Sequence, residues 1–390
     1  MFQNIQKHNL QNTSTIITTC LAVCTLALNL GCEKQTQIGP RQGQGYMINY
    51  EQSQILDYNV AWQSSVARSI LGNAKSLIPG DDYIIASEDG SNVISAVTNR
   101  DGTPLWQVPV GDRLERLLGI TRVGNTVIAA TQSDLYLLDV ATGRTTSTQK
   151  YGGENIASTM PIIIDNEAVY GTTDGRIVYH NLNAGLMRGA YRFTTGFDMK
   201  PIRVSDTAVL VVTRTGRINL LDVKASTVYW EAGVLDPIEA TPALGKTGLF
   251  IAGIDQSVWA FRLEDGHLMW RTRFQYPLRD DPKLIDNILY QAVPNQGLAA
   301  INATTGQINW QNSAVKGGTV ITQHNGDLIV WDKDNAQDSY GSTFYRINPE
   351  TGEIKGQVRS DWINYAIATK MNNGTILGLS RAGRIIKLIP

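Results

Sequence analysis

The stretch ATTGQINW, Ala303 to Trp310, places a glycine in a short polar turn and a tryptophan four residues later. Related octamers recur as NRDGTPLW (99–106), VATGRTTS (140–147), LEDGHLMW (263–270) and PETGEIKG (349–356). The shared turn position is held by Gly102, Gly143, Gly185, Ser226, Gly266, Gly306 and Gly352, at spacings of 41, 42, 41, 40, 40 and 46 residues. A repeat of this length is typical of a β-propeller with four strands in each blade.

Each octamer is flanked by segments with the pattern of short β-strands. In one repeat these are TMPIII (159–164), AVYGTTDGR (168–176) and RIVYHNL (176–182), and the turn at Gly185 follows the third. Glycine supplies the positive φ that tight hairpin turns require, and a preceding Asp, Asn or Thr bonds to the local backbone. The octamer therefore predicts the tip of the outer hairpin of a blade.

The two ends of the chain predict one further blade. After Gly352 there are 38 residues, which contain the strand patterns AIATK (366–370), TILGLS (375–380) and RIIKLI (384–389) but no fourth strand. Near the N-terminus, NVAWQSSV (59–66) carries Trp62 and has no partner nearby in sequence. Pairing the two ends leaves no open sheet edge. We therefore predict an all-β, eight-bladed propeller over residues 57–390, closed by its terminal strands.

Four tryptophans, Trp106, Trp230, Trp270 and Trp310, follow the turn residue by four positions. On the outermost strand they would cover apolar surface between neighbouring sheets. A ligand cage is the alternative, but side chains that recur with the period of the scaffold favour a packing role.

Residues 1–31 have the pattern of a secretory signal peptide. They contain one lysine, no acidic residue and the apolar run IITTCLAVCTLALNLG from Ile16 to Gly31. This run is shorter than the roughly 20 residues that a membrane-spanning helix needs, although a retained single-span anchor is the alternative. Residues 32–56 are rich in glutamine and glycine without hydrophobic periodicity, which predicts a flexible tether.

The signal-like segment ends in LNLGC, which resembles the lipobox of bacterial lipoproteins. The resemblance implies that Cys32 carries the lipid, and Glu33 in the following position implies the periplasmic face of the outer membrane. Asn29 departs from the leucine usual at its position, which leaves cleavage without lipidation open.

Composition narrows the class of function. With 34 basic and 35 acidic residues, the chain has no charge excess that would indicate nucleic-acid binding. No cysteine follows Cys32, which excludes disulfides, thiolate metal sites and a cysteine nucleophile downstream. The three histidines beyond residue 31, His180, His267 and His324, have no metal-ligand spacing. We therefore expect no cofactor and no enzymatic activity.

The repeat D-x-x-[TD]-G-x-x-x-W resembles the tryptophan-docking repeats of quinoprotein dehydrogenases and their non-enzymatic relatives. One function that this resemblance implies is that of a periplasmic quinoprotein dehydrogenase. Another is that of a non-enzymatic propeller that serves as a binding module. That family, however, uses a vicinal cysteine pair and a calcium site beside its quinone, and residues 33–390 contain no cysteine.

Lipobox, polar segment and eight blades together resemble the BamB family, the lipoprotein subunit of the β-barrel assembly (BAM) machinery. The resemblance implies a non-enzymatic scaffold that binds the periplasmic domains of BamA and assists insertion of β-barrel proteins, with unfolded outer-membrane proteins as possible further partners.

In that family, the BamA contact lies on two adjacent loops near the middle of the chain. The second loop resembles LDPIEATP (235–242), where Asp236 and Glu239 take the acidic role. The first corresponds to TTGFDMKP (194–201), which is shorter and lacks the family's leucine and arginine run, so we expect Phe197 as apolar anchor and Lys200 as cation. Ordinary connections between blades are the alternative for both loops.

Overall fold

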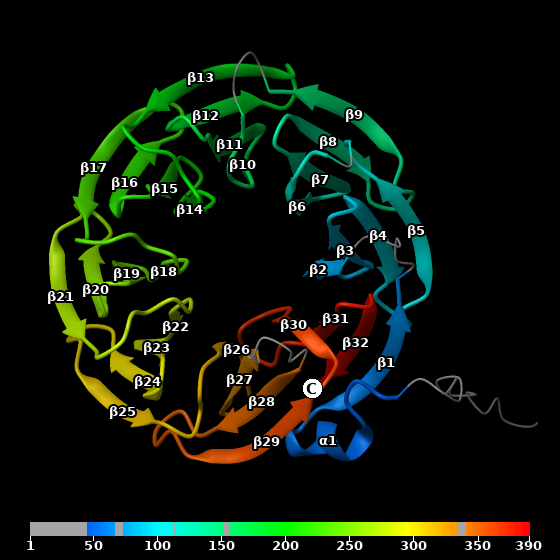
Figure 1. Cartoon of the computed structure of the whole chain (residues 1–390), viewed down its shortest axis with the longest axis vertical. Coiled ribbons are helices and arrows are strands. Elements are labelled where there is room, and N and C mark those ends of the chain that lie inside the picture. The colour runs from blue at the N-terminus through cyan, green and yellow to red at the C-terminus, as the bar shows by residue number, and fades with distance from the viewer. Residues whose placement is uncertain (1–44, 67–72, 113, 152–155, 334–340) are drawn as a thin grey trace, which may run out of the picture. The chain divides into compact units, whose positions relative to one another are not determined.

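Eight four-stranded antiparallel sheets stand around a common axis in the computed structural model, as Figure 1 shows. The structure describes residues 45–66, 73–112, 114–151, 156–333 and 341–390, which belong to one compact unit, Gly43–Pro390. The prediction of an eight-bladed, all-β propeller is confirmed.

Seven blades are built from consecutive strands, and each runs from an inner strand to an outer one. Their strands are β2 (Asn73–Ile78), β3 (Tyr83–Asp89), β4 (Val93–Thr98), β5 (Pro104–Pro109); β6 (Leu117–Val123), β7 (Thr126–Thr131), β8 (Asp134–Asp139), β9 (Thr145–Lys150); β10 (Ile162–Ile164), β11 (Glu167–Gly171), β12 (Arg176–Asn181), β13 (Leu186–Arg192); β14 (Ile202–Arg203), β15 (Ala208–Val212), β16 (Arg217–Asp222), β17 (Thr227–Gly233); β18 (Ala243–Leu244), β19 (Gly248–Ala252), β20 (Ser257–Arg262), β21 (Leu268–Arg273); β22 (Lys283–Ile285), β23 (Ile288–Val293), β24 (Gly297–Asn302), β25 (Ile308–Asn312); and β26 (Thr319–His324), β27 (Asp327–Lys333), β28 (Ser342–Ile347), β29 (Ile354–Ser360).

The eighth blade joins the two ends of the chain. Its order is β1 (Asn59–Ser65), β32 (Arg384–Ile389), β31 (Ile376–Ser380) and β30 (Ile363–Ala368). Strand β1 runs antiparallel to β32 with Trp62 opposite Lys387, and Trp62 is only 9% exposed. The predicted closure by terminal strands is confirmed, and the sheet edge of β32 is covered.

Each outer hairpin tip receives a side chain from the preceding blade. Gly306 has a φ of +75°, and a Cβ built on it would lie 2.7 Å from ring atoms of Trp270. The Trp270 indole N–H donates to the carbonyl of Ala303, three residues before the glycine, at 2.9 Å. The same bond links Trp62 to Asn99, Trp106 to Val140, Trp230 to Leu263 and Trp310 to Pro349. The tryptophans are therefore packing and docking residues, as the repeat predicts.

Two junctions between blades use a polar side chain where the others use tryptophan. The Gln149 amide donates to the carbonyl of Leu182 at 2.7 Å, and the Arg188 guanidinium donates to the carbonyl of Val223. Both carbonyls lie three residues before a turn residue, Gly185 and Ser226, as at the tryptophan junctions. The carbonyl acceptor is thus the constant element of the repeat, and the donor varies.

The last junction has no hairpin tip, because β32 and β1 are not consecutive in the chain. Helix α1 (Tyr50–Ile55) lies against the outer strand β29 there, with the Gln52 amide donating to the carbonyl of Arg359 at 3.2 Å. The helix starts with a capping box between Asn49 and Gln52. Among the described residues, no helix is long and apolar enough to span a membrane.

The segment before β1 differs from the predicted tether in its second half. Met47, Ile48, Leu56 and Tyr58 are at most 2% exposed and pack in one core cluster with residues of β29–β32. The prediction extended the tether to residue 56, which is wrong for residues 45–56. The error arose because the three buried apolar residues between positions 47 and 56 have no regular spacing in the sequence. Residues 1–44 lie outside the described part of the chain.

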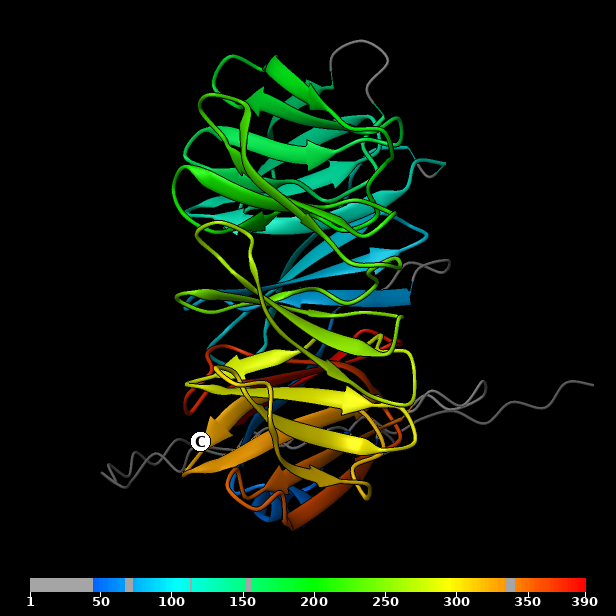
Figure 2. The ribbon, with the colours of Figure 1, turned by 90° about the vertical axis from the view of Figure 1, so that its left-hand side faces the viewer.

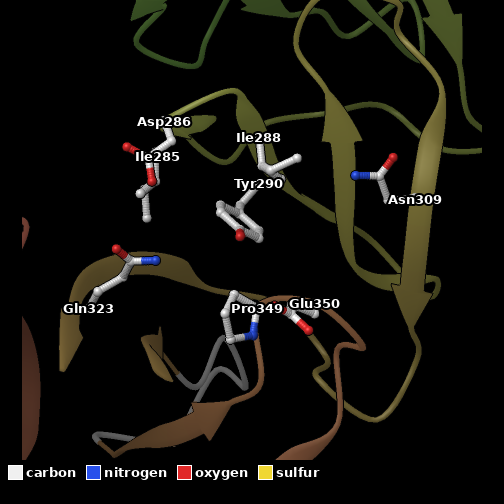
Figure 3. Close-up of a pocket in the computed structure, with 8 residues that line it drawn as sticks. All are labelled: Ile285, Asp286, Ile288, Tyr290, Asn309, Gln323, Pro349 and Glu350. Carbon is white, nitrogen blue, oxygen red and sulfur yellow. The ribbon is translucent and has the colours of Figure 1, made fainter. Parts of the chain in front are cut away.

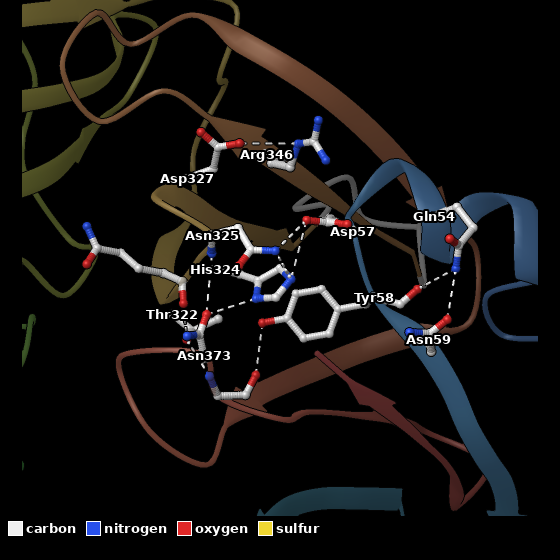
Figure 4. A network of polar contacts seen from close by, with 12 residues as sticks. Gln54, Asp57, Tyr58, Asn59, Thr322, His324, Asn325, Asp327, Arg346 and Asn373 are labelled. Atoms are coloured by element: carbon white, nitrogen blue, oxygen red, sulfur yellow. Dashed lines mark hydrogen bonds and ion pairs between the residues drawn. The ribbon is translucent and has the colours of Figure 1, made fainter.

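A polar network fixes the same segment to the neighbouring strands (Figure 4). The Tyr58 hydroxyl donates to the carbonyl of Gly374 at 2.9 Å. The Asn325 amide donates to the Asp57 carboxylate at 2.8 Å, and His324 Nδ1 lies 3.0 Å from Asn373 Oδ1. Three sections of chain far apart in sequence are therefore held together by hydrogen bonds at the closing blade.

We expect His180 on β12 to make the stability of the fold depend on pH in mild acid. Its side chain is fully buried, Nε2 lies 3.0 Å from Gln149 Oε1, and Nδ1 has no partner among the described residues. Burial lowers the pKa of His180 below its usual value of about 6.5. Below about pH 6.5, the His180 imidazole therefore binds a proton more readily in the unfolded chain than in the folded one. The free energy of unfolding that depends on His180 is fully present above this pH and is lost as the pH falls.

We expect the free energy of unfolding to decline between pH 7 and pH 5 in wild-type protein, and to decline less in His180→Asn. Urea unfolding at several pH values measures both slopes. His267→Asn is the control, because its side chain is 74% exposed. Equal pH slopes for wild type and His180→Asn would contradict the assignment.

Candidate functional site: three connecting loops on one face

Strand direction alternates within each blade, so turns and connections collect at two opposite faces of the ring, which Figure 2 shows from the side. The connections from an outer strand to the next inner strand share a face with the turns between second and third strands. Three of them are nine residues long: 193–201, 234–242 and 274–282. We call their exposed side chains the loop surface.

The fifth position of all three loops is a buried apolar residue. Phe197, Ile238 and Leu278 are 1%, 8% and 0% exposed. Phe197 packs edge-on against Phe193, and it lies so close to Gly171 that a Cβ there would approach it to 2.7 Å. The prediction of Phe197 as an apolar anchor for a partner is therefore wrong, because this side chain belongs to the core and presents no surface.

Backbone contacts hold the loops against the blade that they leave. The N–H of Phe193 donates to the carbonyl of Gly175 at 2.7 Å, and the N–H of Val234 to that of Gly216 at 3.1 Å. Gly216 has a φ of +80°, and a Cβ there would lie 2.4 Å from the carbonyl oxygen of Asp236. Glycine is thus required where the loop crosses the turn.

The second and third loops are joined by charge. The Arg279 guanidinium makes an ion pair and hydrogen bond with the Glu239 carboxylate. Beside it, the Asp281 carboxylate accepts from the backbone N–H of Thr241 at 2.6 Å. Burial, and then the adjacent Asp281 carboxylate, raises the pKa of Asp280. Side chains from two blades therefore form one connected polar surface.

The remaining predicted residues lie where a partner could reach them. Lys200, Asp236 and Glu239 are exposed, and they lie on loops of neighbouring blades on the same face. Leu235, next to Asp236, is 77% exposed and is the prominent apolar side chain of its loop. Sequence reasoning missed Leu235 and Arg279 as site residues, although the first stands in the quoted LDPIEATP and the second at the position matching Glu239 in the next loop.

The described residues hold no group of three His, Cys, Asp or Glu side chains that could bind a metal ion. The loop surface combines an exposed leucine with charged groups of both signs, on loops fixed by backbone bonds. Such a surface suits recognition of a protein partner, because little order has to be gained on binding. Fold and site define the class: a β-propeller with an exposed loop surface on one face.

Comparison with known proteins gives the family. The family model for outer membrane protein assembly factor BamB matches residues 53–186, 89–212, 183–275 and 214–361. The chain therefore belongs to the BamB family. The outer membrane protein assembly factor BamB of Salmonella typhimurium is 21% identical over 360 residues, covering 83% of this chain and 87% of that protein. The BamB of Legionella pneumophila is 26% identical over 170 residues, covering 40% of this chain and 42% of that protein.

Solved structures agree on the fold. BamB from Moraxella catarrhalis superimposes with a TM-score of 0.65 at 19% identity, over 84% of this chain and 98% of that one. The computationally designed Ika8 protein gives a TM-score of 0.67 at 14% identity, over 85% and 99% of the two chains. At such low identity the likeness concerns the architecture alone.

Proposed function

We propose that this protein is a non-enzymatic scaffold subunit of the outer-membrane β-barrel assembly machinery, which binds the periplasmic domains of BamA through the loop surface. Membership of the BamB family gives the general role in outer-membrane protein assembly. The observation that carries the specific proposal is the ion pair between Arg279 and Glu239, which joins two loops into one exposed surface beside Leu235.

The proposal includes a lipid anchor on Cys32 at the periplasmic face of the outer membrane. It rests on the lipobox-like LNLGC and on Glu33, which lie outside the described residues. Residues 33–44 would connect the anchor to the first described residue, Gly45.

Pull-down from solubilised outer membranes tests the partner. A Leu235→Ser, Arg279→Glu double variant is expected to retain at most about one-thirtieth of the BamA that wild type retains, since central interface residues contribute about 2 kcal/mol or more. Leu186→Ser is the control, because Leu186 is 67% exposed but lies on the outer strand β13. Full retention of BamA by the double variant would refute this surface as the contact.

A further inference from the structure

A pocket lies between the blades β22–β25 and β26–β29, on the face opposite the loop surface (Figure 3). Its volume is about 310 Å³. Apolar atoms of Ile285, Ile288 and Pro349 form part of its wall. The rest is polar and comes from separate strands and turns: Asp286, Tyr290, Asn309, Gln323 and Glu350.

None of the five polar side chains has a hydrogen-bond or ionic partner among the residues that the structure describes. Most polar groups on this face are engaged; the Asn302 carboxamide, for example, accepts from the backbone N–H groups of Thr304 and Thr305. Asp286, Asn309 and Glu350 are exposed and Gln323 is half-buried, so their side chains are open to a ligand from solvent, whereas Tyr290 is buried. Buried polar groups are usually paired, so the Tyr290 hydroxyl without a partner indicates an absent ligand.

Tyr290 is the clearest indication of a missing ligand, because it is only 3% exposed. Its ring packs beside Trp310, with centroids 6.0 Å apart, and its hydroxyl points into the pocket (Figure 3). The matching position, opposite the inner strand, holds Phe250 in the preceding blade and Leu210 in the one before. A hydroxyl here is therefore not needed for packing. Burial, and then the Asp286 charge, raises the pKa of Tyr290 to about 12, so it stays neutral.

The charge of the pocket indicates the ligand. Asp286 and Glu350 each contribute a carboxylate, and no lysine or arginine is among the lining residues. In the preceding blade, the position of Asp286 is occupied by Lys246. The negative charge is therefore a property of this junction rather than of the repeat.

We propose that this pocket binds an arginine side chain of an extended polypeptide. A guanidinium presents five N–H donors in a plane, and the pocket offers two carboxylates and a hydroxyl as acceptors. A guanidinium is less strongly hydrated than an ammonium, so it suits a pocket with an apolar wall formed by Ile285 and Ile288. The volume is at the lower end for ligand pockets, which fits one side chain rather than a large cofactor.

The pocket lies on the face opposite the loop surface, so the two sites can be tested separately. Loss of arginine binding would leave retention of BamA unchanged, and loss of BamA binding would leave this pocket intact. The inference thus goes beyond the proposed function and does not depend on it.

Isothermal titration at low salt with the peptide acetyl-Gly-Ser-Arg-Ser-Gly-amide tests the proposal. We expect it to bind about tenfold more tightly than the same peptide with citrulline, which has the same shape but no charge. Glu350→Gln and Asp286→Asn should each weaken binding of the arginine peptide about tenfold, and Tyr290→Phe by a few-fold.

Glu264→Gln is the matched control, because Glu264 occupies the position of Glu350 on another hairpin tip, outside the pocket. It should bind the arginine peptide like wild type. Free agmatine serves as the probe for a small-molecule cation, and tighter binding of agmatine than of the peptide would overturn the assignment to a polypeptide. Equal affinity for the arginine and citrulline peptides, or unchanged affinity in both carboxylate variants, would overturn the site itself.

Discussion

Deletion of residues 45–66 is expected to abolish the cooperative unfolding transition of the protein. The deletion removes five large side chains that are at most 9% exposed: Met47, Ile48, Leu56, Tyr58 and Trp62. At about 2 kcal/mol each, their burial contributes on the order of 10 kcal/mol, which equals the whole stability of a typical domain. It also uncovers the edge of β32, which invites aggregation.

Urea unfolding followed by tryptophan fluorescence, together with limited proteolysis, measures this effect. Deletion of residues 33–44 is the control, since it removes none of these side chains, and it should leave the transition unchanged. A chain without residues 45–66 that melts like wild type would show that the ring does not depend on its terminal strand.

Substitution of Gly306 by alanine is expected to cost about 3 kcal/mol of unfolding free energy. Part of this is the strain of a positive φ, which is on the order of 1 kcal/mol for a residue with a Cβ. The larger part is steric, because the new Cβ would lie 2.7 Å from the Trp270 ring, and overpacking costs about 1–3 kcal/mol.

Gly124→Ala separates the two contributions. Gly124 also has a positive φ, +56°, but a Cβ there meets nothing within 4 Å. We expect this control to lose only about 1 kcal/mol in urea unfolding. If both alanine variants lose the same free energy, the contact between tryptophan and the hairpin tip contributes nothing to stability.

The fold could be predicted from sequence because its signal is repeated. A glycine with positive φ and a docking tryptophan are needed at one blade junction after another, so Gly306 and Trp310 have counterparts 40 residues away. The same reasoning explains the closing blade, where Trp62 takes the position that the repeat requires. Helix α1 occurs only once, at the junction that lacks a hairpin tip, and no repeat could indicate it.

The site was harder to predict, because the sequence of one loop does not show which of its side chains are exposed. Phe197 stands in a loop sequence of ordinary polarity and looks like an anchor until its loop is aligned with the loops that contain Ile238 and Leu278. The pocket beside Tyr290 was missed for another reason. Its polar residues come from five strands and turns of two blades, and only the folded chain brings them together.

The pairing of β1 with β32 has a consequence for biosynthesis. Arg384 to Ile389, the partners of the first strand, are made more than 300 residues after it. Long-range pairing of this kind forms slowly, because closing a large loop costs chain entropy before the stabilising contacts form. During synthesis, β1 must therefore stay unpaired until its partner strand β32 has been made. A chain that ends before Arg384 leaves β1 without its partner strand, and such an unpaired edge invites aggregation.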